Sequence, residues 1–581
     1  MRRFVLGLSM LFPAAAMPAA APFIAAPVPA GSIPVQLCPT EAVASGSPHL
    51  VTFGLPLPRG SLTSAQLASV RVLKGANEIA AFVEQMTPWR HRSNAAIDGA
   101  SVRVARIQIE YAFAGSACES VSVSWGGAAR TQNRPSLLPP RTAWHVVGSG
   151  TFVAADAVRE PDVYAVLPKE WLAKGVLKGV QDLPFDASIT STRDDPATMD
   201  ATEHWPGWSE ADHALKNNFF SGINEDPGVQ AANQCPYKTD YEPWLYDRSA
   251  TMYALYFRGG SLKALREAVR ASDFYAGHID ANGWFSLKGE DTKYVYPENL
   301  AYTAWLTGDA TQLSHLPAML AAHDTFPDVW VTNPDRFWTE RHAAFKLLAN
   351  SIAWELDGGI ARRDKVNAEI AELVRHQDGA NGQIPQPAGF VDGGLYHLGT
   401  QHDYDWDETS YGASSWMSVL LVDAALRAYA TAEDLPTANL VRRLGNFLRV
   451  ATVDTLEHSY DTYEDTLALP RYAMLIDGSD GQRNYEDIEH ALDVAAGLAW
   501  AGYFADLTGQ PDARLRQRAT DLYFSYDIGV NYWIRPLGPQ SGLTAYRVAP
   551  WRKWGWEQRV SVGFGWAMGA AGDSIFANGF D

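Results

Sequence analysis

Apolar and polar residues follow two different spacings along the chain, and the change falls near residue 200. Before it, short runs such as 101–113 and 119–125 alternate apolar and polar residues between Gly and Pro. Alternation with a period of two is typical of half-buried strands. After residue 240, apolar residues recur at helical spacing in long segments. The pattern predicts a multidomain α and β protein, with an antiparallel β domain, a sandwich or a barrel, at 30–200 and a helical domain at 201–572.

The helical half repeats one plan five times. An apolar, aromatic helix ends, a tight turn rich in Gly, Asp or Pro follows, and a more charged helix begins. Apolar helices sheathed by amphipathic ones predict an (α/α) toroid of about five to six helical hairpins. A helical solenoid is the alternative, but its repeats would share one period, which these do not. The hairpins lie at 253–269, 302–316, 354–370, 427–444 and 503–519, with a further helix expected within 560–572.

Polar and aromatic residues precede the apolar body of each inner helix, as in the segment NYEDIEHALDVAAGLAWAGYF at 484–504. An inner helix is buried along its body, so its polar first turn is expected to emerge at the mouth of the toroid. These helix heads are therefore expected to meet. They include Glu242, Trp244, Arg248, Tyr296, Glu298, Asn299, Trp338, Glu340, Arg341, His342, His402, Asp403, Tyr404, Asp405, Trp406, Asp407, Glu408, Tyr411, Tyr485, Glu486, Asp487 and His490.

Aromatic rings next to carboxylates, histidines and arginines are typical of an enzyme that acts on sugars. Rings stack on sugar faces, while the polar groups hold hydroxyls and move protons. Each residue also has a structural interpretation. An acidic residue in a first helical turn complements the helix dipole. His490 could pair with Glu486 or Asp487 on one helix face, and Glu340 or Arg341 could form surface ion pairs.

Two cleavage reactions and one binding function fit these residues. We expect a polysaccharide, most simply an acidic, uronate-containing one cleaved by β-elimination, as the substrate. The alternatives are an inverting glycoside hydrolase, with two separated carboxylates, and a noncatalytic glycan-binding protein. For elimination the candidates are His490, His342 or His402 as base, Tyr404 or Tyr485 as acid, and Arg341, Arg248 or Asn299 as the group that neutralises the uronate. For hydrolysis they are Asp405, Asp407 or Glu408 opposite Glu242, Glu298 or Glu486; the sugar-binding candidates are Trp244, Arg248, Tyr296, Glu298, Asn299, Trp338, Trp406 and Tyr411.

Charge and motifs exclude several other classes of function. The formal net charge of −19 argues against a nucleic-acid or anionic-membrane partner. No phosphate-binding loop, dinucleotide fingerprint, HExxH or GxSxG motif occurs. Asp403, Asp405 and Asp407 imitate the start of a calcium loop, but Glu408 and Ser414 occupy the positions of its turn Gly and closing Glu. The sequence therefore predicts no cofactor and no metal site, and it supports no calcium site or particular oligomeric state.

The N-terminus and the cysteines point to export. Residues 1–21 combine a basic N-terminus, a short apolar run and a cleavage region of small residues. This pattern predicts a signal peptide and a secreted or periplasmic protein. No later stretch is apolar enough to cross a membrane. Cys38 and Cys118 both fall in the strand-rich part, so one disulfide is expected there, with Cys235 unpaired. Residues 573–581 are expected to form a C-terminal tail.

Three N-terminal segments carry a resemblance to a known family. They are 49–62, with the phrase F-G-x-P-x-P-x-G, followed by 70–90 and 101–113. Together they resemble the RIFT-barrel domain of rhamnogalacturonan exolyases and their YetA-like relatives. The helical part is similar to the six-hairpin glycosidase-like class of polysaccharide lyases and glycoside hydrolases. The resemblance implies a RIFT barrel followed by a catalytic toroid, with a His near the mouth, but it does not name the polysaccharide.

Overall fold

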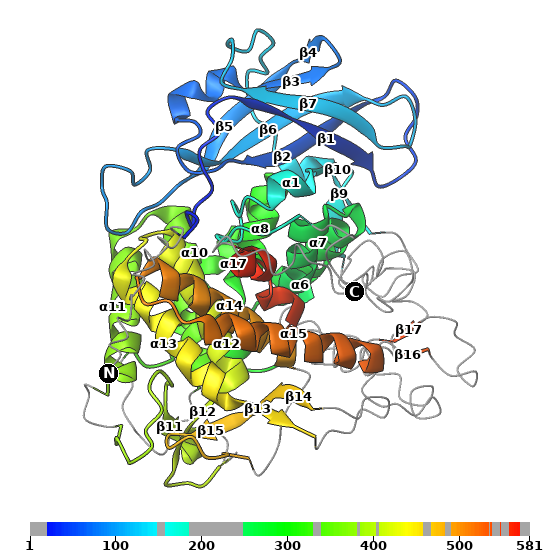
Figure 1. The fold of residues 1–581 in the computed structure, drawn as a ribbon. Helices are drawn as coiled ribbons and strands as arrows, with labels where there is room; N and C mark the ends of the chain where they lie inside the picture. Colours follow the sequence, from blue (N-terminus) through cyan, green and yellow to red (C-terminus); the bar gives the residue numbers. More distant parts are fainter. Residues whose placement is uncertain are drawn as a thin grey trace, which may run out of the picture.

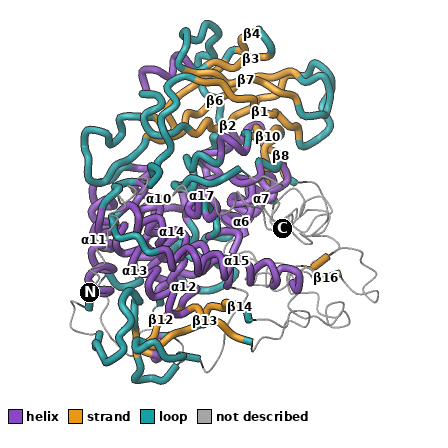
Figure 2. The backbone as a smooth tube through the Cα atoms, viewed as in Figure 1, coloured by secondary structure: helices purple, strands orange, loops and turns teal. Residues whose placement is uncertain are grey.

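The computed structural model describes residues 20–147, 157–184, 248–328, 339–379, 384–402, 406–456, 466–482, 490–533, 535–536, 546–547 and 557–569. An N-terminal region of antiparallel strands lies against a region of helices, as expected (Figure 1). Small sheets lie at the opposite side of the helices (Figure 2). Residues 1–19 of the expected signal peptide, Cys235, the C-terminal tail and the expected change near residue 200 lie outside the described residues.

Two antiparallel sheets form the N-terminal region. One has the strand order β10-β1-β7-β3-β4 and the other β2-β6-β5. Both contribute to one apolar core, and the expected disulfide joins Cys38 to Cys118. The strands are β1 (Gly31–Pro39), β2 (Pro48–Pro56), β3 (Arg71–Lys74), β4 (Asn77–Ile79), β5 (Ala81–Pro88), β6 (Val102–Ala112), β7 (Glu119–Trp125) and β10 (Val163–Val166), with β8 (Trp144–Val146) and β9 (Arg159–Pro161) as a separate pair and the short helix α1 (Lys169–Leu172) after them.

The five helical hairpins form where the sequence predicts them. In each of the last four, a helix buried along almost its whole length precedes one with a single buried face. The pairs are α6 (Arg248–Gly259) with α7 (Leu262–Gly277), α8 (Pro297–Thr307) with α9 (Leu316–His323), α10 (Glu340–Asp357) with α11 (Ile360–Gln377), α12 (Ser415–Ala430) with α13 (Leu435–Ala451), and α14 (Ala491–Leu507) with α15 (Ala513–Trp533); α17 (Phe564–Gly569) is the further helix expected near the C-terminus.

The first helix of each hairpin contacts the first helix of the next. Thus α6 contacts α8, α8 contacts α10, α10 contacts α12, α12 contacts α14, and α14 contacts α17. Arg258 of α6 donates a hydrogen bond of 3.3 Å to Gln558, which precedes α17. The small strands lie between hairpins: β11 (His397–Leu398), β12 (Tyr411–Ser414) and β15 (Ala473–Leu475) form one sheet, β13 (Thr452–Thr455) pairs with β14 (Leu467–Pro470), and β16 (Arg535–Pro536) pairs with β17 (Tyr546–Arg547).

The C-terminal ends of the buried helices face the strand region. Glu355, near the end of α10, accepts from Arg103 of β6 and from Arg427 of α12, the latter at 2.7 Å. These three side chains are at most 2% exposed. At the end of α8, Trp305 donates a 2.9 Å hydrogen bond to Thr87 of β5. The N-terminal ends of these helices therefore point away from the strand region.

Glu355→Gln tests this buried junction. Removing the charge leaves two buried guanidinium groups without a counter-ion, so we expect the free energy of unfolding to fall by about 3–5 kcal/mol. The control is Glu433→Gln. Glu433 pairs with Arg59 between the same two regions, but its side chain is 34% exposed, so we expect a loss below about 1 kcal/mol. Urea unfolding of both variants is the measurement, and equal losses would contradict the role given to Glu355.

Gly54, in the phrase F-G-x-P-x-P-x-G, lets β2 approach the end of α8. A Cβ atom at Gly54 would lie 1.7 Å from the carbonyl oxygen of Trp305. That oxygen belongs to the backbone, so the two elements would have to separate. We expect Gly54→Ala to destabilise the protein by about 1–3 kcal/mol or more. Gly127→Ala is the matched control, because a Cβ there meets nothing within 4 Å. In thermal unfolding, the midpoint of Gly127→Ala should stay near that of the wild type, whereas the midpoint of Gly54→Ala should fall.

Candidate functional site

The N-terminal ends of four buried helices bring polar and aromatic side chains together on the side away from the strand region. We call this group the helix-head cluster. It contains residues from α8, α10, α12 and α14, from the segments before α8 and α14, and from the segment before α17. Its members are Asp291, Tyr296, Glu298, Glu340, Arg341, His342, Trp416, His490, Asp493 and Arg559.

His490 is held by a carboxylate and an aromatic ring. It is the residue before the first turn of α14, and its Nδ1 lies 2.7 Å from Oδ2 of Asp493. The ring stacks on Trp416 of α12, with centroids 4.7 Å apart and planes 8° apart. Donation from Nδ1 to Asp493 assigns the lone pair to Nε2. An imidazole oriented in this way by a carboxylate can accept a proton at Nε2.

Arg341 lies against the same tryptophan. Its Cζ is 5.8 Å from the Trp416 ring centroid, and the residue is 7% exposed. Within the described ranges, no ion pair or hydrogen bond joins the Arg341 side chain to another residue, and its Nε is buried without a partner. A buried guanidinium without a counter-ion is unfavourable. The arrangement favours an anionic ligand at this position.

His342 is hydrogen-bonded at both ring nitrogens. Its Nδ1 lies 2.9 Å from the hydroxyl of Thr339, and its Nε2 lies 3.3 Å from Oδ1 of Asp291. The ring also stacks on Phe326. Burial lowers the pKa of His342, and the Asp291 carboxylate only partly opposes that effect. His342 is thus a neutral, fixed side chain with less scope to act as a base than His490.

Glu298 and Tyr296 meet Arg559 at the head of α8. Arg559 forms an ion pair with Glu298, and its Cζ lies 5.6 Å from the Tyr296 ring centroid. Burial would raise the pKa of Glu298, but the positive charges of Arg559, Lys178 and Arg427 together hold the pKa below its usual value. Because Glu298 is already neutralised by a buried arginine, it is a poor candidate for a free catalytic carboxylate.

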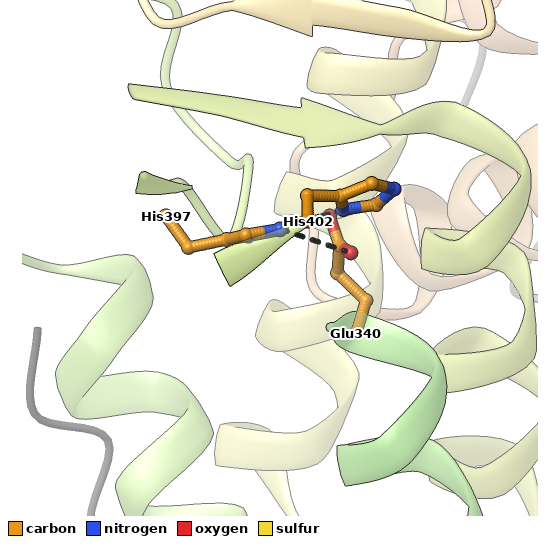
Figure 3. Close-up of side chains that lie close together, drawn as sticks. All are labelled: Glu340, His397 and His402. Atoms are coloured by element: carbon orange, nitrogen blue, oxygen red, sulfur yellow. Dashed lines mark hydrogen bonds and ion pairs between the residues drawn. The ribbon is translucent and has the colours of Figure 1, made fainter. Parts of the chain in front are cut away.

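Glu340, His397 and His402 point toward one another beside this cluster (Figure 3). Nε2 of His397 lies 2.8 Å from Nδ1 of His402 and 3.9 Å from Oε2 of Glu340. Burial raises the pKa of Glu340 to about 8, lowers that of His397 to about 3, and lowers that of His402 well below its usual value. Two neutral imidazoles and a carboxyl group are side chains that can hold a metal ion.

Trp406 packs against His397 and His402. Its ring centroid lies 4.6 Å from that of His402 and 5.3 Å from that of His397, and its Nε1 donates to the Ser410 carbonyl at 3.0 Å. A Cβ at Gly412 of β12 would lie 2.8 Å from the Trp406 ring. The tryptophan is therefore fixed by packing and is 5% exposed.

The structure brings only part of the predicted site together. His490, His402, His342, Arg341, Tyr296, Glu298 and Trp406 lie in or beside the helix-head cluster, and Asn299 is buried in α8. Asp407 and Glu408 are exposed, and Asp407 instead accepts hydrogen bonds from Thr409. Tyr411 lies in β12 opposite Leu398. Glu242, Trp244, Trp338, Asp403, Tyr404, Asp405, Tyr485, Glu486, Asp487 and the side chain of Arg248 lie outside the described residues.

Several members of the site are missing from the sequence-based prediction. Asp493 could have been predicted from the sequence, because it follows His490 by three residues and this spacing places two side chains on one face of a helix. The same holds for His397, since it precedes His402 by five residues. Trp416, Asp291 and Arg559 reach the site from distant segments and carry no local signal.

No family model, curated protein or solved structure matches the chain. In the part of the chain that the structure describes, no helix has the length and apolar character needed to span a membrane.

Proposed function

We propose that this protein is a secreted or periplasmic carbohydrate-active enzyme that cleaves an acidic, uronate-containing polysaccharide by β-elimination. The observation that carries the proposal is Arg341, a buried guanidinium without an ion-pair partner among the described residues. A uronate carboxylate would provide that partner. Trp416 contacts both Arg341 and His490, so it places the proposed anion-binding group next to the proposed base.

In the proposed reaction, His490 takes the proton from C5 of the uronate. Asp493 orients its imidazole and stabilises the imidazolium that forms. Arg341 neutralises the uronate carboxylate and so stabilises the negative charge that develops when the proton leaves. The electrons of the broken C5–H bond form the C4–C5 double bond, and the glycosidic oxygen leaves from C4. We propose Tyr404 or Tyr485 as the donor of the proton that this oxygen receives.

The toroid and the RIFT barrel are part of the proposal. An (α/α) toroid is supported by the order of contacts from α6 to α17 and by the hydrogen bond from Arg258 back to Gln558. The RIFT-barrel resemblance is supported by the antiparallel strands that follow its quoted segments and by the packing role of Gly54. Export is supported by the Cys38–Cys118 disulfide, since such bonds persist in oxidising compartments.

The inverting hydrolase and the glycan-binding protein are the alternatives. A hydrolase needs two carboxyl groups that face each other across the sugar, separated by about 6.5–9.5 Å. Among the described candidates, Glu298 is paired with Arg559, and Asp407 and Glu408 are exposed. A binding protein would use Arg341 and Trp416 without His490. The histidine and arginine arrangement therefore favours elimination.

The first experiment incubates purified mature protein with pectic, alginate-like and glucuronate-containing polysaccharides. Ultraviolet absorbance reports the unsaturated uronate that only elimination produces, and a reducing-end assay runs in parallel. Under the proposal, absorbance and reducing ends rise together on one acidic substrate. Reducing ends without absorbance would establish hydrolysis instead. Binding without either signal would support the glycan-binding alternative.

Variants at His490 and Arg341 test the assigned roles. We expect His490→Gln to lower kcat by roughly 10²–10⁴-fold, because the proton acceptor is lost. Arg341→Met should lower kcat/KM by roughly 100-fold or more, because the uronate loses its counter-ion. His315→Gln and Arg375→Met are the controls. His315 lies at the end of a short 3-10 helix, and Arg375 pairs with Glu372 on α11, so both should retain activity. Retained activity in both site variants would overturn the assignment.

A further inference from the structure

Glu340, His397 and His402 form a compact group of possible metal ligands. Glu340 is the first residue of α10, His397 lies on β11, and His402 follows the short 3-10 helix Gly399–Gln401. One ligand atom from each residue lies within 4.8 Å of the others. All three are at most 1% exposed. The group thus joins two segments more than fifty positions apart in the sequence.

We propose that these three residues bind one divalent transition-metal ion, with Zn²⁺ as the best fit. Two imidazole nitrogens and a carboxylate oxygen are typical zinc ligands, whereas Ca²⁺ and Mg²⁺ prefer oxygen alone. Ligand atoms around a tetrahedral zinc at about 2.0–2.1 Å lie roughly 3.3 Å apart. The observed separations of 2.8 Å and 3.9 Å bracket that value. All three separations lie within 4.8 Å, so side-chain movements of about 1.5 Å or less would complete the site.

Neighbouring groups already orient the ligands. Nδ1 of His397 lies 3.1 Å from the carbonyl oxygen of Leu395, which assigns its proton to Nδ1 and leaves the Nε2 lone pair facing Glu340 and His402. The backbone N–H of Ser414 donates to Oε1 of Glu340 at 2.9 Å. Outer hydrogen bonds of this kind fix the orientation of metal ligands in known sites. The group has the ligands and also the supporting contacts of a metal centre.

The carboxylate of Glu340 gives an independent reason to expect a cation at this position. Oε2 of Glu340 is buried and has no hydrogen-bond partner among the described residues, although it faces the two histidines. A buried oxygen of this kind is unfavourable unless it is paired. The positive groups nearby do not supply that partner: Arg341 makes no ion pair within the described chain, and Lys346 is paired with Asp328. A metal ion between the three side chains would satisfy it.

The ion would hold the head of α10 against the β11–β12 segment. Glu340 is next to Arg341, and Trp406 packs on His402. Three protein ligands leave one tetrahedral position for water. We assign the ion a positioning role, since it would fix the backbone that presents Arg341 and Trp406. This inference does not depend on the proposed reaction, because its test measures metal binding and stability.

The test uses the full-length mature protein, freed of metal with a chelator and then given Zn²⁺, Co²⁺, Ca²⁺ or Mg²⁺ alone. Under the proposal, about one Zn²⁺ per chain remains after dialysis, and the thermal midpoint rises by roughly 5 °C or more. Co²⁺ should give the visible absorption of a tetrahedral nitrogen and oxygen site. Ca²⁺ and Mg²⁺ should leave the midpoint unchanged. No retained Zn²⁺ and no shift in the midpoint would overturn the proposal.

Variants separate this site from adventitious surface binding. His397→Gln, His402→Gln and Glu340→Gln should each lose the retained Zn²⁺ and the cobalt spectrum. His323→Gln is the matched control, because His323 is also a fully buried histidine but bonds the Val295 carbonyl instead. It should retain one Zn²⁺. Undiminished Zn²⁺ in the three site variants would overturn the proposal. If a variant does not fold, the cobalt spectrum of the wild type is the test, and the absence of tetrahedral absorption would overturn the proposal.

Discussion

The carboxylate of Glu355, buried between Arg103 and Arg427, is the interaction on which the rest of the arrangement depends. It joins β6 to the ends of α10 and α12, so it fixes which end of the helices lies against the strands. Arg103 extends the junction by donating to the Val176 and Leu177 carbonyls. A buried ion pair of this kind adds little net stability, but it is costly to break. We infer that its main effect is to select one orientation of the helices.

In that orientation most buried charges of the helical region are paired. At the strand end, Arg103 and Arg427 share Glu355, and in the middle of α12 Asp423 pairs with Lys178 at 2.8 Å. At the other end, Arg559 pairs with Glu298, but Arg341 has no such partner among the described residues. Within the described ranges, the other buried Lys and Arg side chains have a carboxylate partner, so Arg341 is the exception. The contrast favours an anionic ligand at the helix heads more strongly than residue composition alone does.

The sequence predicts the elements of this fold better than it predicts the site. Alternation identifies β7 at the bounds the structure has, and the five helical hairpins follow from apolar periodicity. The expected partners of His490, Glu486 and Asp487, lie outside the described residues, and Asp493 bonds His490 within them. The site also needs Trp416 and His397, whose positions depend on how α12 and β11 pack. Local spacing reports which face of an element is buried but not which distant element covers it.

The first turn of α10 shows why polar residues at the N-terminal end of a buried helix can indicate a ligand site. Consecutive residues on a helix point about 100° apart, so Glu340, Arg341 and His342 face three different neighbours. Glu340 faces His397, Arg341 faces Trp416, and His342 faces Asp291. α10 is buried on all sides and these three side chains are at most 7% exposed, so each needs a polar partner nearby. The His342 ring has hydrogen-bond partners within the chain. Among the described residues, the Arg341 guanidinium has no anionic partner and Oε2 of Glu340 has no hydrogen-bond partner. One helical turn thus places a metal ligand and an anion receptor side by side, and a metal ion holding Glu340 would also hold Arg341 in position.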